Sequence, residues 1–291
     1  MIKSHIYLTR QKMLSSDYEI YYYSDTELEK VNLHHHDFYE CYLFLYGDVS
    51  YIIEGRDYTL RPGDIILINT KELHQPIIHS KAVSYDRIVL WLNKAFLHGL
   101  SSESLDLSSC FEANEKGNVI RTNVDNQQNI KTLLYKLLQM EVYGGLGREL
   151  LYKAYITELL VLLNTLVFKS STQLDIEIKK SNLIEDIIVY INQHLEEDIR
   201  IEDLSELFYI SKFHLLREFK KFTGTTIHKF IIQKKLILSK ELILAGNPIT
   251  SVYSQCGFGD YSNFFRAFKN EYGVTPKQFY TMMITPCEIQ E

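Results

Sequence analysis

Residues 256–276 have the sequence CGFGDYSNFFRAFKNEYGVTP, which predicts a tight turn followed by a short amphipathic helix with a basic face. Asp260 is suited to cap the start of this helix, and Gly273 is suited to end it. Residues 249–255, before the turn, predict a short bracing helix. Together these elements predict a helix-turn-helix, whose second helix can enter the major groove of DNA.

An earlier segment has the same layout. Residues 202–208 predict a short helix, Tyr209-Ile210 a turn, and Ser211 the cap of a second helix that ends before Gly224. Both second helices contain Arg-x-Phe-Lys, at residues 217–220 and 266–269. One basic amphipathic helix is often only a solvated face, whereas two such copies favour DNA binding. A long helix over residues 226–245 joins them and would place the reading helices in major-groove turns about 34 Å apart.

Each reading helix has an inner and an outer face. The spacing of Leu215, Phe219 and Phe222, and of Phe264 and Phe268, directs these side chains inward. The residues expected to contact DNA are Ser211, Lys212, Phe213, Leu216, Arg217, Lys220, Lys221, Tyr261, Ser262, Phe265, Arg266 and Lys269. Among them, the arginines suit bidentate contacts with guanine, and Lys220 and Lys269 suit phosphates.

Charge divides the chain into two parts. The 291 residues carry a formal net charge of −6, which taken alone argues weakly against nucleic-acid binding. Residues 204–280 nevertheless contain 11 Lys/Arg and 5 Asp/Glu, a local net charge of +6, which leaves −12 on the rest of the chain. This distribution indicates a basic nucleic-acid-binding part joined to an acidic part.

Composition excludes several other classes of protein. At 46% hydrophobic and 23% charged residues, the chain has material for about two packed domains and no signature of disorder. The four cysteines have no C-x-x-C spacing, so neither a zinc site nor a disulfide framework is indicated. The sequence shows no uninterrupted apolar run of about 18 residues and no secretory signal, so we expect a cytoplasmic protein without a membrane partner.

The first third of the chain predicts short strands. Residues 39–46 and 49–53 are aromatic and β-branched, and Gly47-Asp48 between them predicts a hairpin turn. Further strands are expected at residues 58–60, 65–68 and 83–92, which together predict a β-sandwich or a small barrel.

After the strands the hydrophobic period becomes helical. Apolar residues recur at helical spacing through residues 126–168, and glycines at 144, 145 and 147 predict two helices that fold back on each other. We expect this pair to form a homodimer, although it could simply cover the β region. A polar linker is expected at residues 169–181, followed by a helical region at 182–291.

The helical half resembles the DNA-binding domain of the AraC/XylS family of bacterial transcription regulators over residues 204–280. The resemblance rests on Ser211-x-x-x-Leu215-x-Arg217-x-Phe219-Lys220, Gly224, Gly257-Phe258-x-Asp260-x-Ser262-x-Phe264-x-Arg266-x-Phe268-Lys269 and Gly273-x-Thr275-Pro276. Some positions depart from the family pattern. Lys235 replaces the usual Arg of the connecting helix, and Tyr253 replaces a small Ala of the bracing helix, where we expect its ring to reorient the second copy.

The β region resembles the cupin superfamily. The spacing His34-x-His36-x3-Glu40-x6-Gly47 matches the first cupin motif, and Gly63 to His74 lies where the second would be. This resemblance implies a small barrel with an open interior. Sensor domains of AraC-type regulators are similar to it, and many of them bind sugars without a metal.

The resemblance implies an effector site inside the barrel. Its expected residues are His34, His36, Glu40, Tyr42, Tyr51, His74 and Trp91. Aromatic faces stack on sugars while imidazole and carboxylate groups bond hydroxyls. Each ring taken singly is better explained as ordinary barrel core. In cupin enzymes His34, His36, Glu40 and His74 occupy the metal-binding positions; the expectation here is no metal and no cofactor, with a metal site as the alternative.

The sequence therefore predicts an α+β chain in four parts. A cupin-like effector domain (1–125), a helical pair (126–168) and a linker (169–181) precede an all-α domain with two helix-turn-helix units (182–291). The expected function is sequence-specific transcription regulation, with no enzymatic activity. Expected partners are double-stranded DNA, a small molecule such as a sugar, a second copy of the chain and, for an activator, RNA polymerase. The alternatives are a metal-dependent cupin enzyme with a helical appendage and a carbohydrate-binding module; both leave the duplicated basic helices unexplained.

Overall fold

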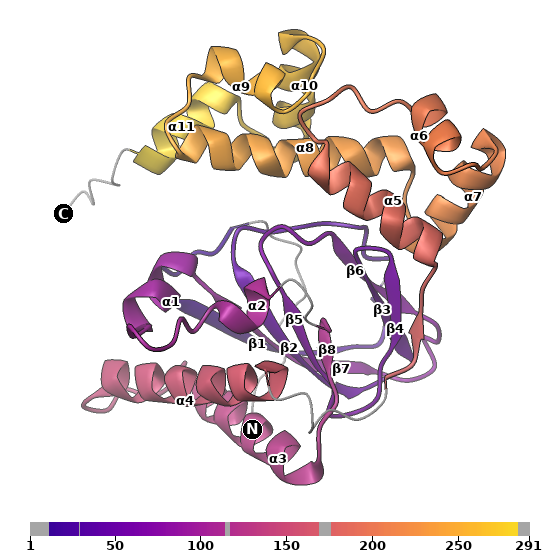
Figure 1. The fold of residues 1–291 in the computed structure, drawn as a ribbon. Coiled ribbons are helices and arrows are strands. Elements are labelled where there is room, and N and C mark those ends of the chain that lie inside the picture. Colours follow the sequence, from indigo (N-terminus) through magenta and orange to yellow (C-terminus); the bar gives the residue numbers. More distant parts are fainter. Residues whose placement is uncertain (1–11, 29, 114–116, 169–175, 285–291) are drawn as a thin grey trace. The chain divides into compact units, whose positions relative to one another are not determined.

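The computed structural model describes residues 12–28, 30–113, 117–168 and 176–284 (Figure 1). The chain forms two compact units, Met1–Lys179 and Lys180–Glu291. The first contains all the described strands, and the second is helical apart from its connections. We call them the sensor unit and the helical unit, and each is described by itself.

The sensor unit consists of two antiparallel sheets that face each other (Figure 1). The larger sheet has the order β1-β7-β2-β5-β8, formed by Tyr18–Asp25, Tyr85–Leu92, Tyr39–Tyr46, Ile65–Ile68 and Val119–Ile120. The smaller has the order β6-β3-β4-β9, formed by His74–Ile78, Val49–Ile53, Arg56–Thr59 and Ile178–Lys179. Aromatic and aliphatic side chains from both sheets fill the space between them. The predicted cupin-like β architecture is confirmed.

The predicted hairpin at Gly47-Asp48 is wrong, although β2 and β3 have the predicted bounds. β2 pairs with β5 and β7, whereas β3 pairs with β4 and β6, so the turn carries the chain from one sheet to the other. A short turn reverses the chain but does not by itself fix which strands pair. The hairpin in this region joins β3 to β4 through Glu54-Gly55, whose φ angles of 47° and 79° suit a type I′ turn.

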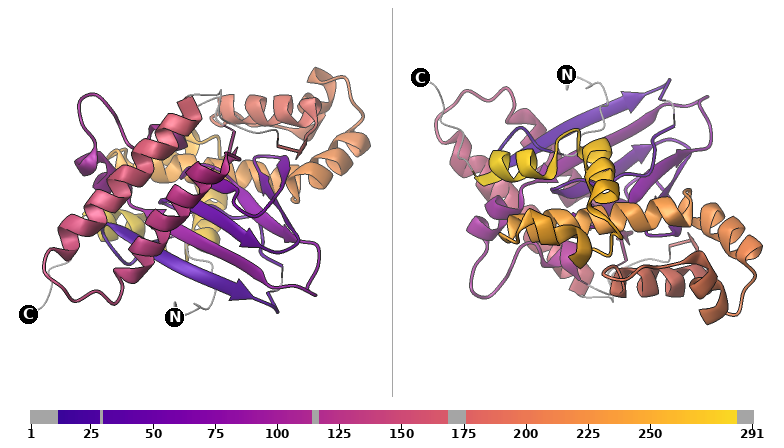
Figure 2. Two further views of the ribbon diagram at one scale, coloured as in Figure 1. Left: turned by 90° about the horizontal axis from the view of Figure 1, so that it is seen from below. Right: turned by 90° about the horizontal axis from the view of Figure 1, so that it is seen from above.

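Both faces of the larger sheet are buried, which explains why its strands are continuously apolar. Along β2, Tyr42 and Phe44 point between the sheets, while Cys41 and Leu43 belong to a second core on the outer face. That core is completed by the helical pair α3 (Val124–Gln139) and α4 (Arg148–Phe168), seen crossing the sheet in Figure 2. Two shorter helices, α1 (Lys94–Leu100) and α2 (Ser109–Glu112), also contribute to it.

The helix α4 carries apolar residues on both its buried and its exposed side. Ile156, Leu159 and Leu163 are buried in the outer core, whereas Leu150, Val161 and Phe168 are exposed. By length and composition α4 is also the one helix among the described residues that would suit a membrane span. Its buried face makes it a core helix of the sensor unit.

The end of the predicted linker belongs to the smaller sheet. Residues 169–175 lie outside the described residues, but Ile178 pairs with Tyr58 and Lys179 with Asp57, forming strand β9 beside β4. The Thr59 amide also donates to the carbonyl of Glu177 at 3.3 Å. The helical unit begins directly after this short strand.

The helical unit is organised around α8 (Ile227–Leu244). Toward one end of α8 lie α5 (Asn182–Gln193), α6 (Ile201–Leu207) and α7 (Lys212–Thr223), and toward the other lie α9 (Ile249–Gln255), α10 (Tyr261–Tyr272) and α11 (Pro276–Ile284) (Figure 1). Leu236 on α8 packs with Phe264, Phe268 and Phe279 in the core of the second group. Each group contains one predicted helix-turn-helix.

Candidate DNA-binding surface and ligand cavity

The two reading helices, α7 and α10, begin and end in the same way. Ser211 Oγ accepts from the amide of His214 at 3.3 Å, and Asp260 Oδ1 accepts from the amide of Asn263 at 2.8 Å. Both helices end at a glycine in the left-handed conformation, Gly224 (φ 73°) and Gly273 (φ 71°). The caps predicted from the sequence are confirmed at all four positions.

The inner faces of the reading helices are buried. Leu215, Phe219, Phe264 and Phe268 are all 0% exposed, as their spacing predicts, whereas Phe222 is only half-buried. The residues predicted to contact DNA lie on the other side. Ser211, Lys212, Phe213, Arg217, Lys220, Lys221, Tyr261, Ser262, Arg266 and Lys269 are exposed, and Leu216 and Phe265 are half-buried. The structure thus places all these residues on accessible faces, and their contact with DNA stays a prediction.

The two arginines are held by neighbours on their own helices. Arg217 Nη2 lies 3.0 Å from His214 Nδ1, and its Nε lies 3.4 Å from a carboxylate oxygen of Glu218. Arg266 Nη2 donates to Asn263 Oδ1 at 2.7 Å. Such contacts at exposed sites contribute little energy and can be exchanged for a base edge.

The ring of Tyr253 lies against the start of the second reading helix. It packs edge-to-face on Tyr261, with centroids 5.9 Å apart, and is half-buried. The expectation that Tyr253 reorients the second copy stays a prediction, while the caps of α10 match those of α7.

A buried lysine that the sequence does not single out as functional supports the turn between α9 and α10. Lys235 on α8 is 4% exposed and donates from Nζ to the carbonyls of Glu197 and Gly257, at 2.7 and 2.6 Å. Burial lowers the pKa of this ammonium. Lys235 therefore ties the turn before the second reading helix to the loop after α5. The signal in the sequence that could have pointed to this role is that Lys235 stands where the family usually has Arg.

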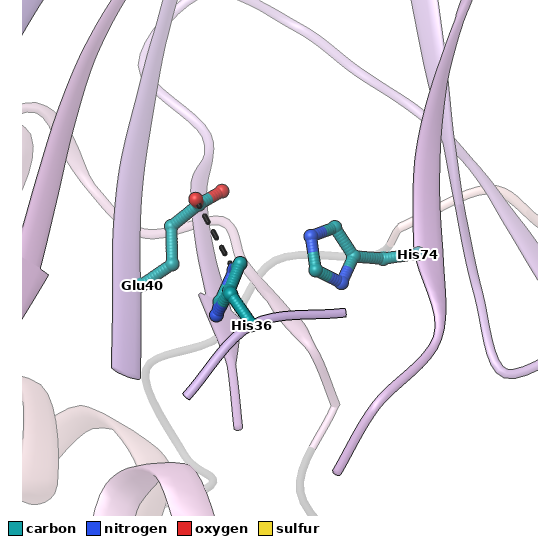
Figure 3. A group of neighbouring side chains, drawn as sticks. All are labelled: His36, Glu40 and His74. Atoms are coloured by element: carbon teal, nitrogen blue, oxygen red, sulfur yellow. Dashed lines mark ion pairs between the residues drawn. The ribbon is translucent and has the colours of Figure 1, made fainter. Parts of the chain in front are cut away.

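The sensor unit brings His36, Glu40 and His74 together between the sheets, as Figure 3 shows. His36 Nε2 lies 3.4 Å from Glu40 Oε2, and the same oxygen accepts a 2.8 Å hydrogen bond from Trp91 Nε1. The His34 ring lies beside that of His74, with centroids 4.3 Å apart. The spacing of the two cupin-like motifs thus predicts this juxtaposition correctly.

Backbone carbonyls fix the tautomer of all three histidines. His34 Nδ1 lies 2.9 Å from the carbonyl of Asn32, His36 Nδ1 lies 2.8 Å from that of Phe38, and His74 Nδ1 lies 2.9 Å from that of Glu72. A carbonyl only accepts hydrogen bonds, so each Nδ1 must carry the proton. In the neutral ring, each Nε2 then presents a lone pair.

The charge state of the cluster follows from burial and from mutual repulsion. Burial, reinforced by the neighbouring His36, lowers the pKa of His34 to about 4. Burial and the adjacent His34 also hold the pKa of His74 well below its usual value. Burial alone would raise the pKa of Glu40, but His36, His34 and the Trp91 hydrogen bond outweigh it and lower that pKa. Glu40 is therefore favoured as a carboxylate, and His34 and His74 are favoured as neutral imidazoles.

The cavity beside this cluster is small. Its lining includes six of the seven predicted effector residues, namely His34, His36, Glu40, Tyr42, Tyr51 and Trp91, while His74 joins through the cluster. Its volume of about 20 Å³ suits roughly one water molecule. The open interior implied by the cupin resemblance is therefore filled, because aromatic rings from both sheets occupy it.

Three polar lining residues are not among those predicted: Tyr23, Tyr85 and Arg87. Arg87 is 2% exposed, lies over both tyrosine rings at 4.7 and 4.1 Å, and pairs with Asp25 at 2.6 Å. The sequence held a signal for two of them, since strand alternation counted back from Trp91 places Arg87 and Tyr85 on the same face.

Sequence models of two protein families match this chain. The "AraC-like ligand binding domain" matches residues 18–140, and the "Helix-turn-helix domain" matches residues 204–282. The first covers strands β1 to β8 and all of α3, and the second covers both reading helices. The chain belongs to the AraC family of transcription regulators.

Relatives of the regulator extend over most of its length. HTH-type transcriptional activator RhaS of Enterobacter sp. (strain 638) is 24% identical over 252 residues, covering 84% of this chain and 86% of the relative. Probable transcriptional regulator LumQ of Photobacterium leiognathi is 27% identical over 249 residues, covering 84% and 90%. Among solved structures, fatty acid-bound ToxT of Vibrio cholerae is 17% identical with a TM-score of 0.42, covering 93% of this chain and 97% of that one.

Proposed function

We propose that this AraC-type regulator reads a specific DNA sequence through α7 and α10. The observation that carries the proposal is the repeated register of the two helices, which have equivalent caps, buried inner faces and exposed basic outer faces. Arg217 and Arg266 contact guanine, whereas Lys220 and Lys269 contact phosphates. A regulator of this kind acts in the cytoplasm, where the DNA is, and as an activator it would also contact RNA polymerase.

Binding to the DNA upstream of its own gene tests this function. We expect the full-length protein to shift this fragment in a gel and to discriminate against unrelated DNA of the same length. Affinity should fall by about 0.9 log units per phosphate contact for each log unit of salt. Equal affinity for both fragments would contradict sequence-specific reading.

A small hydroxylated molecule, such as a sugar, is the proposed effector of the sensor unit. The cavity combines aromatic faces from Tyr42, Tyr51 and Trp91 with the polar groups of Glu40 and the histidines. Because the present volume suits about one water, effector binding must displace some of these side chains. A ligand that favours the displaced arrangement shifts the population of the regulator toward it.

The effector can be found by screening sugars and sugar acids against the full-length protein. Binding should raise the unfolding temperature and alter the fluorescence of Trp91, the single tryptophan of the chain. Tyr51→Ala should weaken the response, while Tyr209→Ala, an exposed position in the helical unit, should leave it unchanged. A response that survives Tyr51→Ala at full affinity would place the ligand elsewhere.

The regulator is proposed to form a homodimer through the helical pair. Leu150, Val161 and Phe168 on α4 are 75%, 42% and 59% exposed, although the opposite side of this helix is already buried in the sensor core. A second copy of the same helix would cover these side chains. Sedimentation of the fragment that ends near residue 169 should show a dimer at micromolar concentration. A monomer alone would contradict the proposal.

A further inference from the structure

The two helix-turn-helix groups of the helical unit are separated by a groove beside α8. In the first group α7 packs against α8, and in the second group α9, α10 and α11 do so (Figure 1). The groove has a volume of about 620 Å³ and is lined by the loop between α5 and α6, by α8, by the turn before α10 and by α10 itself. Contacts across this groove therefore determine how firmly the two reading helices are held relative to each other.

Lys235 lines the groove and bonds to both of its sides. Its Nζ donates to the carbonyl of Glu197 in the α5–α6 loop at 2.7 Å and to the carbonyl of Gly257 in the turn before α10 at 2.6 Å. An ammonium group has three N–H donors and no acceptor, so one group can hold two carbonyls at once. Hydrogen bonds from a charged donor are also about twice as strong as neutral ones. The Lys235 bridge thus joins the first group to the second.

The backbone at Gly257 allows the same close approach. Gly257 has a φ of 67°, and a Cβ atom at this position would lie 2.6 Å from the carbonyl oxygens of both Leu195 and Glu197. Only a residue without a side chain lets the loop lie so close to the turn. The fit of the two backbone segments and the bonds of Lys235 therefore favour one arrangement of the two groups.

Each end of the bridge leads to a reading helix. In the second group Phe258, the residue after the bridged glycine, packs on Phe264 of α10 with ring centroids 5.4 Å apart. In the first group the bridged loop follows α5, which packs against α7. Tyr190 on α5 also packs edge-to-face on Phe208, directly before the first turn, with centroids 6.1 Å apart. A shift of either bridged carbonyl would therefore be transmitted to the adjacent reading helix.

We propose that Lys235 is a positioning residue that fixes the separation and rotation between α7 and α10, and that it thereby restricts the regulator to one spacing of the two DNA segments that these helices read. The inference rests on the proposed reading of DNA by both helices. Each added base pair moves one segment by about 3.4 Å along the DNA and rotates it by about 35°. A rigid pair of helices cannot follow this change, whereas a loosened pair can.

The competing interpretation is that Lys235 only stabilises the turn before α10. Its removal would then lower the stability of the helical unit without changing the preferred spacing of the DNA segments. The ratio of affinities for two spacings separates the interpretations, because a purely structural role does not alter that ratio in folded protein.

The test compares two DNA fragments with full-length protein. One is the operator upstream of the regulator's own gene, and the other has one base pair inserted between the two segments located by footprinting. Wild type should bind the inserted fragment at least about 10-fold more weakly. Lys235→Met keeps a long side chain without a donor, and this ratio should fall below about threefold. Lys235→Arg retains N–H donors and should restore a ratio of at least about 10-fold.

Two matched controls accompany these variants. Lys229→Met removes the same charge from an exposed position of α8 and should keep the wild-type ratio, whatever its effect on affinity itself. Gly257→Ala places a Cβ against the α5–α6 loop and should lower the ratio as Lys235→Met does. Gly246→Ala introduces the same left-handed strain, at a φ of 85°, where no atom lies within 4 Å, and should keep the ratio.

Hydrogen exchange in the absence of DNA tests the bridge itself. The amides of Glu197 and Phe258 are both hydrogen-bonded, to the carbonyls of His194 and Tyr253. In full-length protein, Lys235→Met should accelerate exchange at both amides together, by at least about 10-fold, because each segment loses its tie to the other. Acceleration at Phe258 alone would show that Lys235 stabilises only the turn.

A folded Lys235→Met variant with the wild-type spacing ratio would overturn the inference, as would a ratio near one in the wild-type protein. Either result, obtained with intact discrimination between operator and unrelated DNA, rejects this inference alone. Equal affinity of wild type for operator and unrelated DNA would instead reject the proposed function on which the inference rests. If Lys235→Met does not fold, the comparison of Gly257→Ala with Gly246→Ala decides, and equal ratios in these two variants would overturn the inference.

Discussion

Arg217 and Arg266 occupy equivalent positions in the two reading helices: each is the sixth residue after its N-cap, Ser211 or Asp260, and each precedes the terminal glycine by seven residues. The equivalence extends to Lys220 and Lys269. A repeated register of this kind means that the two helices can present the same chemistry to two groove segments.

Removing one arginine should reduce sequence discrimination. We expect Arg217→Ala to lose about 1–3 kcal/mol of preference at one base position, because a bidentate guanine contact disappears. Competition binding with single-base operator variants measures this loss. Arg200→Ala is the control, since Arg200 is an exposed arginine paired with Asp198 before α6. A uniform loss across all sequences would instead identify Arg217 as a phosphate contact.

Removing a reading-helix lysine should have a different signature. Lys220→Ala is expected to weaken binding about equally for all sequences and to reduce the slope of log affinity against log salt by about one. Titrations at several salt concentrations provide the slope. An unchanged slope with lost discrimination would mean that Lys220 reads bases.

The caps should contribute stability to the helical unit. Ser211→Ala and Asp260→Ala each remove an acceptor from the first turn of a reading helix and should cost about 1 kcal/mol of unfolding free energy. Urea unfolding followed by circular dichroism measures the change. Ser211→Thr retains a capping hydroxyl and should lose less. Wild-type stability in both alanine variants would show that the caps are dispensable.

A buried ion pair should be important to the sensor unit. Asp64 is 0% exposed and accepts from Arg121 through both oxygens, at 2.8 and 2.6 Å. Arg121→Met leaves this carboxylate buried without its partner and should cost about 3–5 kcal/mol, measured by denaturant unfolding with Trp91 fluorescence. Lys153→Met breaks an exposed pair with Glu149 and should cost less than about 1 kcal/mol. Similar losses of unfolding free energy in the two variants would contradict the expected difference between the buried and the exposed ion pair.

Acid should destabilise the sensor unit through His34. Its pKa falls from 6.5 in the unfolded chain to about 4 in the fold, so between these values the unfolded state binds more protons. Stability contributed by neutral His34 is therefore present above about pH 6.5 and is lost as pH falls toward 4. The free energy of unfolding, measured across this pH window, should fall less in His34→Gln than in the wild-type protein. Parallel pH profiles would mean that His34 is protonated in the native state.

The helical unit was predicted well because its helix ends are marked by residues that lie next to each other in the sequence. The bounds of α9 and α10 match the prediction, since a cap residue and a glycine mark the ends of the reading helix. The strands β2, β3 and β5 were located equally well from their apolar runs. The pairing of the strands was not predicted correctly, because the partner of β3 depends on how two sheets close around a common interior.

The candidate sites likewise have some features that the sequence predicted and others that it did not. Motif spacing placed His36, Glu40 and His74 together, because the family resemblance carries that geometry. Arg87 was missed because a charged residue in a strand is normally expected to face water. The small cavity could not be predicted either, since it depends on the packing of many aromatic rings.

Strand β9 lies at the boundary between the two units of the regulator. Two residues beside β4 are the last part of the chain to belong to the sensor unit, and Tyr58 on β4 points into the sensor core. A strand this short can leave its sheet without unfolding either unit. In the proposed homodimer, effector binding that alters the path of β4 would then change the length of free chain between the two units, and with it the separation allowed between two operator half-sites.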